Sequence, residues 1–547
     1  MRLKLAFSLT LLIAIQSVTC QNQHNRQRGN VNDESQKLNI VADSVTNLAQ
    51  KISNAITSQK SKTEIFSPVS IAGALSLLLL GASGTTRTEL ENVMGFDSRI
   101  SFTDIHKSFG KLFRELVTND PILKSEIPWR ATDKCNNYDY DDDDVGMRGG
   151  FQAPQTPAKR PKRQSECYIN DGMPVEVTIG NGIFSQDGQM IDEKYGRLAD
   201  QLYQTNISTL DFHNNPSRAI DTINKWVRNQ TRCKINEIVS NLSPETQLVI
   251  ANTLYFRAEW EEPFLKDGTK PRKFFPNGPE KAGYDVPMMV HGGCFPYFNW
   301  KEADTRVVGF PYKRNITMYV FLPNNSNRIK LVGLGTKVNA DVINDIIQKM
   351  EVKTVSIQFP KLHMVNSFGM KELLEQLGAD SVFDQKRSQL YRVISGGSKF
   401  GGGEVEDEDE DIFDQLEDTE KNARDELKEK YPGCTPTEND HDNRQDCERN
   451  PLCKFGGGVC VCCAKMFGSA RVRRQAQAQS LFVNEVVHKV DVVVNEKGTE
   501  GGAVTATLLD RITPQINFRV TGPFLMLIRD ETTKLPLFYG NVYDPAS

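Results

Sequence analysis

Residues 498–507 have the composition of a β-strand that could be added to an existing sheet. An alternating apolar run that includes Val487, His488 and Lys489 leads into this segment, and Glu500 is its only charged residue. The other residues are glycine, alanine, threonine or valine. Because none is bulky or proline, the backbone N–H and C=O groups can pair with neighbouring strands. The chemistry open to this segment is therefore backbone hydrogen bonding inside a sheet.

After a further stretch that includes Arg511, apolar strands are expected over residues 523–530 and 536–542. This order of hinge, variable loop and closing strands closely resembles the serpins. The resemblance implies an α+β fold with a large mixed central β-sheet, surrounding helices and an exposed reactive centre loop, in a monomer. It implies a protease inhibitor that works once and is not itself an enzyme. The protease cleaves the loop, forms an acyl-enzyme, and is dragged along as the cut loop enters the sheet.

The resemblance also assigns a hinge that must enter the sheet first. Each inserted residue must tolerate burial and pairing, so bulky, charged or proline residues would stop the movement. Gly501 and Gly502, where the family prefers alanine, each weaken the strand by about 0.5 kcal/mol. The hinge residues are Glu496, Gly498, Thr499, Glu500, Gly501, Gly502, Ala503, Val504 and Thr505.

The bond that the protease would cut has two candidates. Family spacing counted from Glu496 gives Ile512-Thr513, and a loop shorter by one residue gives Arg511-Ile512. Arg511 is the only basic residue between Lys497 and Arg519, and a guanidinium matches an aspartate-floored pocket through bidentate hydrogen bonds. We prefer Arg511 and an extracellular trypsin-like serine protease as the partner, whereas Ile512 would imply an elastase-like enzyme.

Other positions match the family in the regions called the shutter and the breach. Ser67 can cap a helix in which Pro68 occupies the first turn. The shutter residues are Ser67, Ser70, Asn252 and His488, and Trp260 belongs to the breach. The clearest departure is Cys233, where the family favours glycine.

Composition and the N-terminus predict a secreted protein. The chain has 547 residues, a net charge of −4 and 25% charged residues, which is typical of a globular protein and gives no sign of nucleic-acid binding. Residues 1–20 have the basic, apolar and small-residue layout of a signal peptide, and no later segment is apolar enough to span a membrane. Sequons, some of which we expect to carry sugar, occur at Asn206, Asn229, Asn241, Asn315 and Asn324.

Ten cysteines remain after removal of the signal peptide, an even number that predicts disulfides in an oxidising compartment. Zinc is disfavoured because the Cys-rich run lacks paired C-x-x-C knuckles, so no metal or cofactor is expected. Cys233 and Cys294 could pair with each other or reach into an insertion. The candidates are Cys135, Cys167, Cys233, Cys294, Cys434, Cys447, Cys453, Cys460, Cys462 and Cys463.

The predicted organisation is a disordered tail over residues 21–37 and a serpin domain over 38–547 with two insertions. Residues 120–172 form an acidic insertion without periodicity, and residues 396–479 form an acidic linker and a Cys-rich insertion. Helices are expected after Leu38, after Ser67, and over 191–202 and 218–227. Strands are expected over 175–184 and 248–256.

Both insertions contain a basic quartet, ending at Arg163 and at Arg474, of the kind cut by furin-like convertases. An acidic tyrosine cluster at 138–144 could steer basic proteases, although a solvated charge run is the simpler reading. Lys107, Lys111 and Arg114 lie at helical spacing where the family binds heparin-like polysaccharides. Three charges are a weak signal, so a solvated helix face is preferred.

An enzyme is disfavoured because the chain lacks a Gly-x-Ser-x-Gly elbow and a His-Glu-x-x-His motif. The Cys-rich insertion and the convertase sites resemble those of invertebrate extracellular serpins. That analogy suggests control of a cascade in clotting, melanisation or innate immunity. The alternative function is a non-inhibitory serpin that acts as a binding or carrier protein.

Overall fold

The computed structural model describes residues 33–56, 61–118, 127–131, 175–394, 413, 416, 453–456, 459–462, 481–499 and 516–545. An N-terminal helix spans residues 33–56. The other helices are α2 (Pro68–Gly81), α3 (Gly84–Met94), α4 (Phe102–Thr118), α5 (Pro128–Ala131), α6 (Glu193–Tyr203), α7 (Pro216–Gln230), α8 (Arg328–Gly335), α9 (Ala340–Lys349) and α10 (Met370–Leu377). Short 3₁₀ helices are η2 (Lys266–Gly268), η3 (Lys301–Ala303) and η4 (Ser381–Phe383).

Three sheets contain all of the described strands. The strands are β1 (Thr63–Phe66), β2 (Val175–Gln186), β3 (Thr205–Leu210), β4 (Leu248–Glu259), β5 (Lys270–Phe274), β6 (Tyr284–Trp300), β7 (Thr305–Pro311), β8 (Ile316–Pro323), β9 (Glu351–Pro360), β10 (Leu362–Gly369), β11 (Cys453–Gly456), β12 (Val459–Cys462), β13 (Glu485–Asn495), β14 (Gly498–Thr499), β15 (Ile516–Arg519), β16 (Phe524–Asp530) and β17 (Pro536–Val542).

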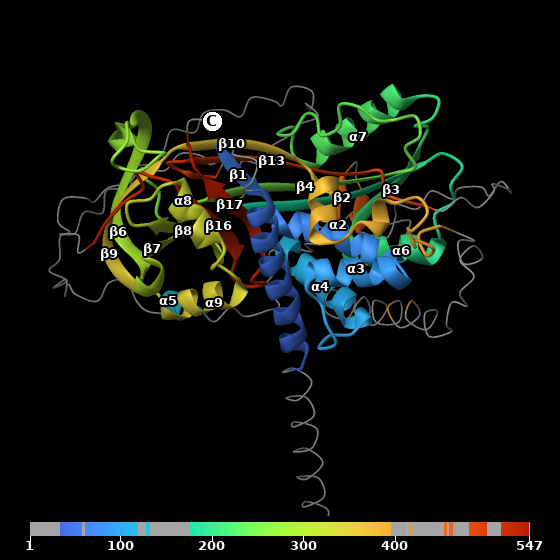
Figure 1. The fold of residues 1–547 in the computed structure, drawn as a ribbon, viewed down its shortest axis with the longest axis horizontal. Helices are drawn as coiled ribbons and strands as arrows, with labels where there is room; N and C mark the ends of the chain where they lie inside the picture. The colour runs from blue at the N-terminus through green and yellow to red at the C-terminus, as the bar shows by residue number, and fades with distance from the viewer. Residues whose placement is uncertain are drawn as a thin grey trace, which may run out of the picture.

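The central sheet has six strands in the order β10-β13-β14-β4-β2-β3. It is mixed, because β13 pairs parallel with β4 and β2 pairs parallel with β3, whereas the other pairs are antiparallel. Figure 1 shows α7 on one face of this sheet and α2, α3, α4 and α6 on the other. Helices cover both faces near β2 and β4, which explains why β4 is an almost continuous apolar run.

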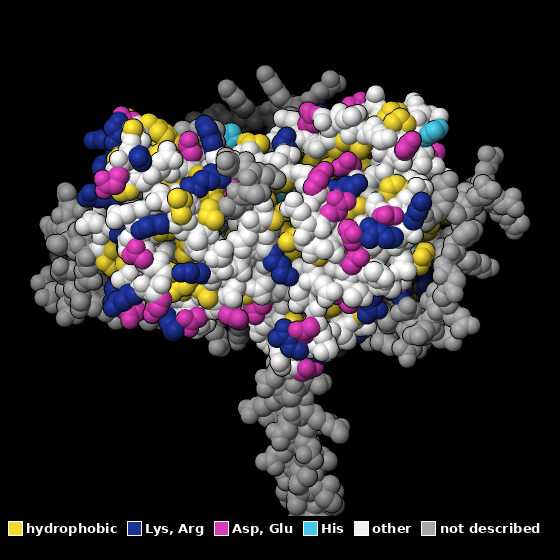
Figure 2. Space-filling view, viewed as in Figure 1, with side chains coloured by type: hydrophobic (Ala, Val, Ile, Leu, Met, Phe, Trp, Pro, Cys, Tyr) yellow, Lys and Arg dark blue, Asp and Glu magenta, His cyan; other side chains and the backbone are white. Residues whose placement is uncertain are grey.

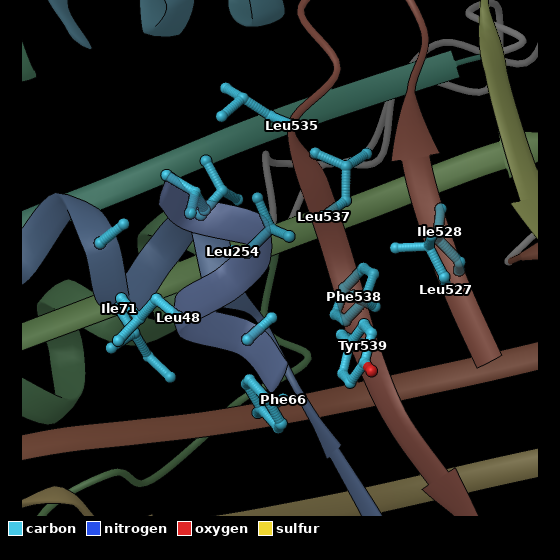
Figure 3. Close-up of a cluster of buried hydrophobic side chains, with 14 of the residues drawn as sticks. Leu48, Phe66, Ile71, Leu254, Leu527, Ile528, Leu535, Leu537, Phe538 and Tyr539 are labelled. Atoms are coloured by element: carbon cyan, nitrogen blue, oxygen red, sulfur yellow. The ribbon is translucent and has the colours of Figure 1, made fainter. Parts of the chain in front are cut away.

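A nine-stranded sheet follows the order β1-β17-β16-β8-β7-β6-β9-β15, with β5 paired to β6. Strands β11 and β12 form a separate hairpin. The two large sheets pack together through an apolar core. Figure 3 shows Leu254 of β4 beside Leu537 and Phe538 of β17, with Leu48 of the N-terminal helix and Phe66 of β1 nearby. All five side chains are buried, and this α+β architecture with a large mixed sheet is the predicted fold class.

Most of the predicted elements are present. Helix α2 begins as expected at Pro68, and the Ser67 Oγ atom accepts a hydrogen bond from the Ser70 backbone N–H at 3.4 Å. The strands predicted over 175–184 and 248–256 correspond to β2 and β4, and the helices predicted over 191–202 and 218–227 correspond to α6 and α7. No helix in the described ranges is both long enough and apolar enough to cross a membrane.

The prediction of a disordered tail is wrong for residues 33–37, because the first helix begins at residue 33. Charges in this first turn find partners: Lys37 pairs with Asp33 at 2.8 Å and with Asp104 of α4 at 3.2 Å. Glu34 accepts a hydrogen bond from Lys111 of α4 at 2.7 Å. These contacts hold the polar first turn of the N-terminal helix against α4.

Parts of both predicted insertions pack against the main core, which their lack of periodicity and low apolar content did not predict. Within 120–172, α5 is helical and its neighbourhood buries Ile127 and Trp129 in the main core. Within 396–479, Phe413 and Leu416 are helical and buried in the same core. Isolated apolar residues in a polar stretch can dock onto a core that other segments supply, which local composition does not reveal.

We expect Leu254→Ala to lower the free energy of unfolding by about 2–5 kcal/mol, because it opens a cavity between the two large sheets. Val365→Ala is the matched control: Val365 is 51% exposed on β10, so its truncation should change the stability by less than about 0.5 kcal/mol. Urea unfolding monitored by circular dichroism measures both. Equal midpoints for the two variants would contradict this account of the core.

Candidate functional site

The two inner strands of the central sheet are close at one end and separated at the other. At the closed end β13 pairs directly with β4, from Glu485 opposite Val249 to His488 opposite Asn252. At the open end β14 lies between them and pairs with both strands. Neighbouring strands are about 4.8 Å apart, so β4 and β13 are about 10 Å apart where β14 separates them. The two strands must therefore splay between these ends.

The two residues of β14 are Gly498 and Thr499, the first hinge residues predicted to enter the sheet. Thr499 lies opposite Val494 on one side and Ala258 on the other. It is buried, and its Oγ1 atom is 2.8 Å from the Tyr312 hydroxyl oxygen. Two residues of the predicted hinge, Gly498 and Thr499, thus occupy positions in the central sheet.

Gly498 is required here for two physical reasons. Its φ of 149° lies in a region that residues with a side chain rarely adopt. A Cβ atom at this position would lie 2.0 Å from the carbonyl oxygen of Ala258. Only glycine lets the backbone of β14 approach β4 this closely.

Glu496 anchors the turn that precedes β14. One carboxylate oxygen accepts a hydrogen bond from Thr269 Oγ1 at 2.7 Å, and the other lies 3.0 Å from Lys361 Nζ. Burial raises the pKa of Glu496, but the contacts with Thr269 and Lys361 outweigh it and leave the pKa below its usual value. The carboxylate therefore stays ionised and holds the base of the hinge.

Trp260, which the resemblance assigns to the breach, lies at the open end of the sheet. Its ring stacks on Tyr312 with centroids 4.0 Å apart and planes 13° apart. Its indole Nε1–H donates to the Asn495 carbonyl at 2.9 Å, and its backbone N–H donates to the Lys497 carbonyl at 3.0 Å. Tyr312 was missed by sequence reasoning, because a lone tyrosine after a strand carries no motif. Together these groups fix the turn between β13 and β14.

The shutter residues meet at the closed end. The Ser67 backbone N–H donates to His488 Nε2 at 3.0 Å, so this nitrogen is an acceptor and the imidazole is neutral. Burial lowers the pKa of His488 to about 3. Asn252 hydrogen-bonds Asn181, which donates to the Tyr203 carbonyl at 2.7 Å. Asn181 was also missed, because an asparagine within a strand gives no signal of its partners.

Several predicted site residues lie outside the described residues. They are the reactive-bond residues Arg511, Ile512 and Thr513, the later hinge residues Glu500, Gly501, Gly502, Ala503, Val504 and Thr505, the convertase residues Arg163 and Arg474, and the cysteines Cys135, Cys167, Cys434, Cys447 and Cys463. Cys453, Cys460 and Cys462 are in the β11–β12 hairpin.

Cys233 and Cys294 are both disulfide-bonded. Cys233 has a φ of 62°, in the left-handed region where glycine is the favoured residue. The departure from the family pattern therefore places a side chain on a strained backbone, at a cost of about 1–2 kcal/mol.

The sequons fall into two groups. Asn206, Asn229 and Asn241 are exposed. Asn315 and Asn324 are half-buried, and their Nδ2 atoms donate to Thr532 Oγ1 at 3.2 Å and to Asp304 Oδ1 at 2.8 Å. Glycosylation remains a prediction at all five.

The basic residues considered for polysaccharide binding are on α4, as predicted, and Lys111 is engaged with Glu34. Figure 2 shows positive and negative side chains interspersed over the visible face. This arrangement supports a solvated helix face rather than a strong polysaccharide site. Polysaccharide binding by these basic residues stays a prediction.

We expect Gly498→Ala to expel β14 from the sheet, because the added Cβ collides with the Ala258 carbonyl oxygen. Amide hydrogen exchange over residues 494–499 should accelerate at least about tenfold. Gly188→Ala is the matched control, because Gly188 has a φ of 92° but nothing within 4 Å of a built Cβ. Unchanged exchange in Gly498→Ala would contradict the placement of the hinge.

Stability should fall as the pH drops below about 6.5, because the unfolded chain binds a proton at His488 that the folded chain excludes until about pH 3. The loss attributable to His488 is about 2 kcal/mol at pH 5. His488→Gln should therefore lose less stability than the wild type between pH 7.5 and pH 5, as measured by urea unfolding. The exposed His363→Gln is the control, and identical pH dependence in wild type and His488→Gln would refute the assignment.

Comparisons with known proteins agree with this geometry. The serpin (serine protease inhibitor) family model matches residues 43–131, 151–405 and 463–545. Serine protease inhibitor 28Dc of Drosophila melanogaster is 28% identical over 512 residues, which are 92% of this chain and 79% of the relative. Alpha-1-antiproteinase F of Cavia porcellus is 24% identical over 505 residues, which are 92% and 90% of the two chains.

Solved structures share the fold. Human thyroxine-binding globulin has a TM-score of 0.63 and 19% identity, with 93% of this chain and 100% of the other covered. Human glycosylated kallistatin has a TM-score of 0.61 and 19% identity, with 92% and 98% covered. The family model matches most of the chain, and the fold agrees with it: this chain belongs to the serpin family.

Proposed function

We propose that the protein is a secreted inhibitor that traps a serine protease covalently through the segment that follows β14. The observation that carries the proposal is the position of Gly498 and Thr499 between two strands that splay. A strand that begins at this point can extend only between β4 and β13. The hinge residues 500–505 are small apart from Glu500, so they can follow Thr499 into the sheet.

The driving force is the completion of the central sheet. Each backbone hydrogen bond added to it contributes about 0.5–1.5 kcal/mol. The shutter pair His488 and Asn252 marks the last residues of β4 and β13 that pair directly, so insertion must separate these neighbours. A neutral His488, which accepts one hydrogen bond and carries no charge, can be displaced at lower cost than an ion pair.

For the reactive bond we favour Arg511-Ile512 over Ile512-Thr513. A guanidinium is the strongest single determinant of binding to a trypsin-like primary pocket, through paired hydrogen bonds to an aspartate. Asp510 next to the cut would exclude proteases with an acidic neighbouring subsite, which narrows the range of targets.

Secretion is supported by chemistry as well as by the N-terminal pattern. Disulfides persist in oxidising compartments, and both Cys233 and Cys294 are disulfide-bonded. The exposed sequons at Asn206, Asn229 and Asn241 are accessible to a glycan. Convertase cleavage after Arg163 and Arg474, and a role in an extracellular cascade of clotting, melanisation or innate immunity, belong to the same proposal.

The second candidate is a serpin that binds a ligand without inhibiting a protease. The fold likeness to thyroxine-binding globulin, whose name records a ligand, keeps this alternative open. The two functions differ in one property: only an inhibitor leaves a complex that survives denaturing electrophoresis. A carrier would be cleaved without trapping the protease.

The test mixes the secreted protein with trypsin, a thrombin-like and an elastase-like enzyme, followed by denaturing gels and mass spectrometry of the released peptide. We expect a covalent complex with trypsin and a peptide that begins at Ile512. Arg511→Ala should slow trypsin trapping at least about 100-fold, the loss of a bidentate charged contact. Thr505→Arg should be cleaved at the same bond without forming a complex, because a charged residue blocks insertion.

A peptide that begins at Thr513 would shift the reactive bond to Ile512-Thr513. Cleavage by all three enzymes with no complex from any of them would reject the inhibitor and favour the carrier.

A further inference from the structure

A cavity of about 380 Å³ lies at the C-terminal base of the reactive loop. Its walls come from four places: the turn after β5, strand β7, the end of β8, and β15 with the turn that follows it. Its apolar lining includes Phe275, Pro279, Leu322 and Pro323. The volume falls within the range of small-molecule sites, about 300–1,000 Å³.

Two arginines, Arg306 of β7 and Arg519 of β15, line the same cavity, which we call the arginine pocket. Arg306 Nη1 donates to the Asn517 carbonyl of β15 at 2.9 Å, and its guanidinium carbon lies 5.6 Å from the Phe518 ring centre. Its Nε atom is buried and has no hydrogen-bond partner in the described part of the chain. Arg519 is exposed.

Neither guanidinium forms an ion pair with any residue that the structure describes. Asp304 is two residues before Arg306, but its carboxylate binds other groups. It accepts a hydrogen bond from Asn324 at 2.8 Å and forms an ion pair with Lys330 at 3.5 Å. Among the described residues, the arginine pocket therefore carries two positive charges without a paired carboxylate. Two like charges held beside one cavity repel each other, and a bound anion removes that repulsion.

We propose that the arginine pocket binds a small organic anion, with a carboxylate or sulfonate group on an apolar body. Arg306 and Arg519 supply charge-assisted hydrogen bonds to the anionic group. Phe275, Pro279 and the end of β8 cover the apolar part, which an inorganic ion would leave unfilled. The combination of two cations and apolar walls selects for this class of ligand.

The arginine pocket lies beside the strand that follows the reactive loop, so a bound ligand should affect that strand. β15 begins at Ile516, and its partner is β9. An anion held by both arginines would link β7 to β15, the strand on which the reactive loop ends. Bound ligand should therefore slow amide hydrogen exchange over residues 516–522. This consequence is independent of protease inhibition, so a failure of either proposal is distinguishable from a failure of the other.

The test uses 8-anilinonaphthalene-1-sulfonate, a fluorescent aromatic sulfonate, with the full-length protein. We expect one saturable site per chain. N-phenyl-1-naphthylamine has the same apolar body without the sulfonate, and it should bind at least about tenfold more weakly, since it lacks the charge-assisted contacts. This comparison needs no variant and does not depend on the folding of one.

Variants then locate the site. Arg519→Gln and Arg306→Gln should each weaken sulfonate binding about tenfold, and Thr521→Phe should abolish it by filling the cavity that Thr521 lines. Arg99→Gln is the matched control, because Arg99 is exposed and paired with Asp97 at 2.9 Å, away from the pocket. Equal binding of the two dyes, non-saturable binding, or unchanged affinity in both Arg306→Gln and Arg519→Gln would overturn the proposal.

Discussion

The pairing of β14 between β4 and β13 is the constraint on which the rest of the central sheet depends. Two residues, Gly498 and Thr499, keep the strands apart at one end, while direct pairing up to His488 and Asn252 holds them together at the other. The spacing between β4 and β13 therefore has to change along the length of the sheet. We propose that the energy of the sheet falls if a further strand enters, and the segment that follows Thr499 is continuous with that position.

The side chains at the two ends have different chemistry for a physical reason. At the open end, the stacked rings of Trp260 and Tyr312 and the ionised Glu496 fix the turn, so the hinge has a defined starting point. At the closed end, neutral groups dominate: His488 accepts from a backbone amide and Asn252 bonds another asparagine. Neutral hydrogen bonds are specific in geometry but weaker than charged ones, which suits a boundary that would open in the proposed insertion.

The sequence predicted the fold class, the strand β4, and the start of α2 after its cap Ser67. These features depend on local patterns, such as a continuous apolar run or a serine before a proline, combined with the order of segments. Residues such as Tyr312, Asn181 and Thr269 could not be found, because their roles come from long-range neighbours and not from any motif. The burial of Trp129, Phe413 and Leu416 was missed for the same reason: each docks on a core made elsewhere in the chain.

The central claim is that the native sheet is incomplete and gains stability when the loop enters it. The most direct measurement is thermal unfolding, by circular dichroism, of the intact protein and of the same protein after a single cut in the reactive loop. Our account predicts a rise in the unfolding temperature of at least about 10 °C after cleavage, since each of several added backbone hydrogen bonds contributes about 1 kcal/mol. An unchanged or lower unfolding temperature in the cleaved protein would contradict it.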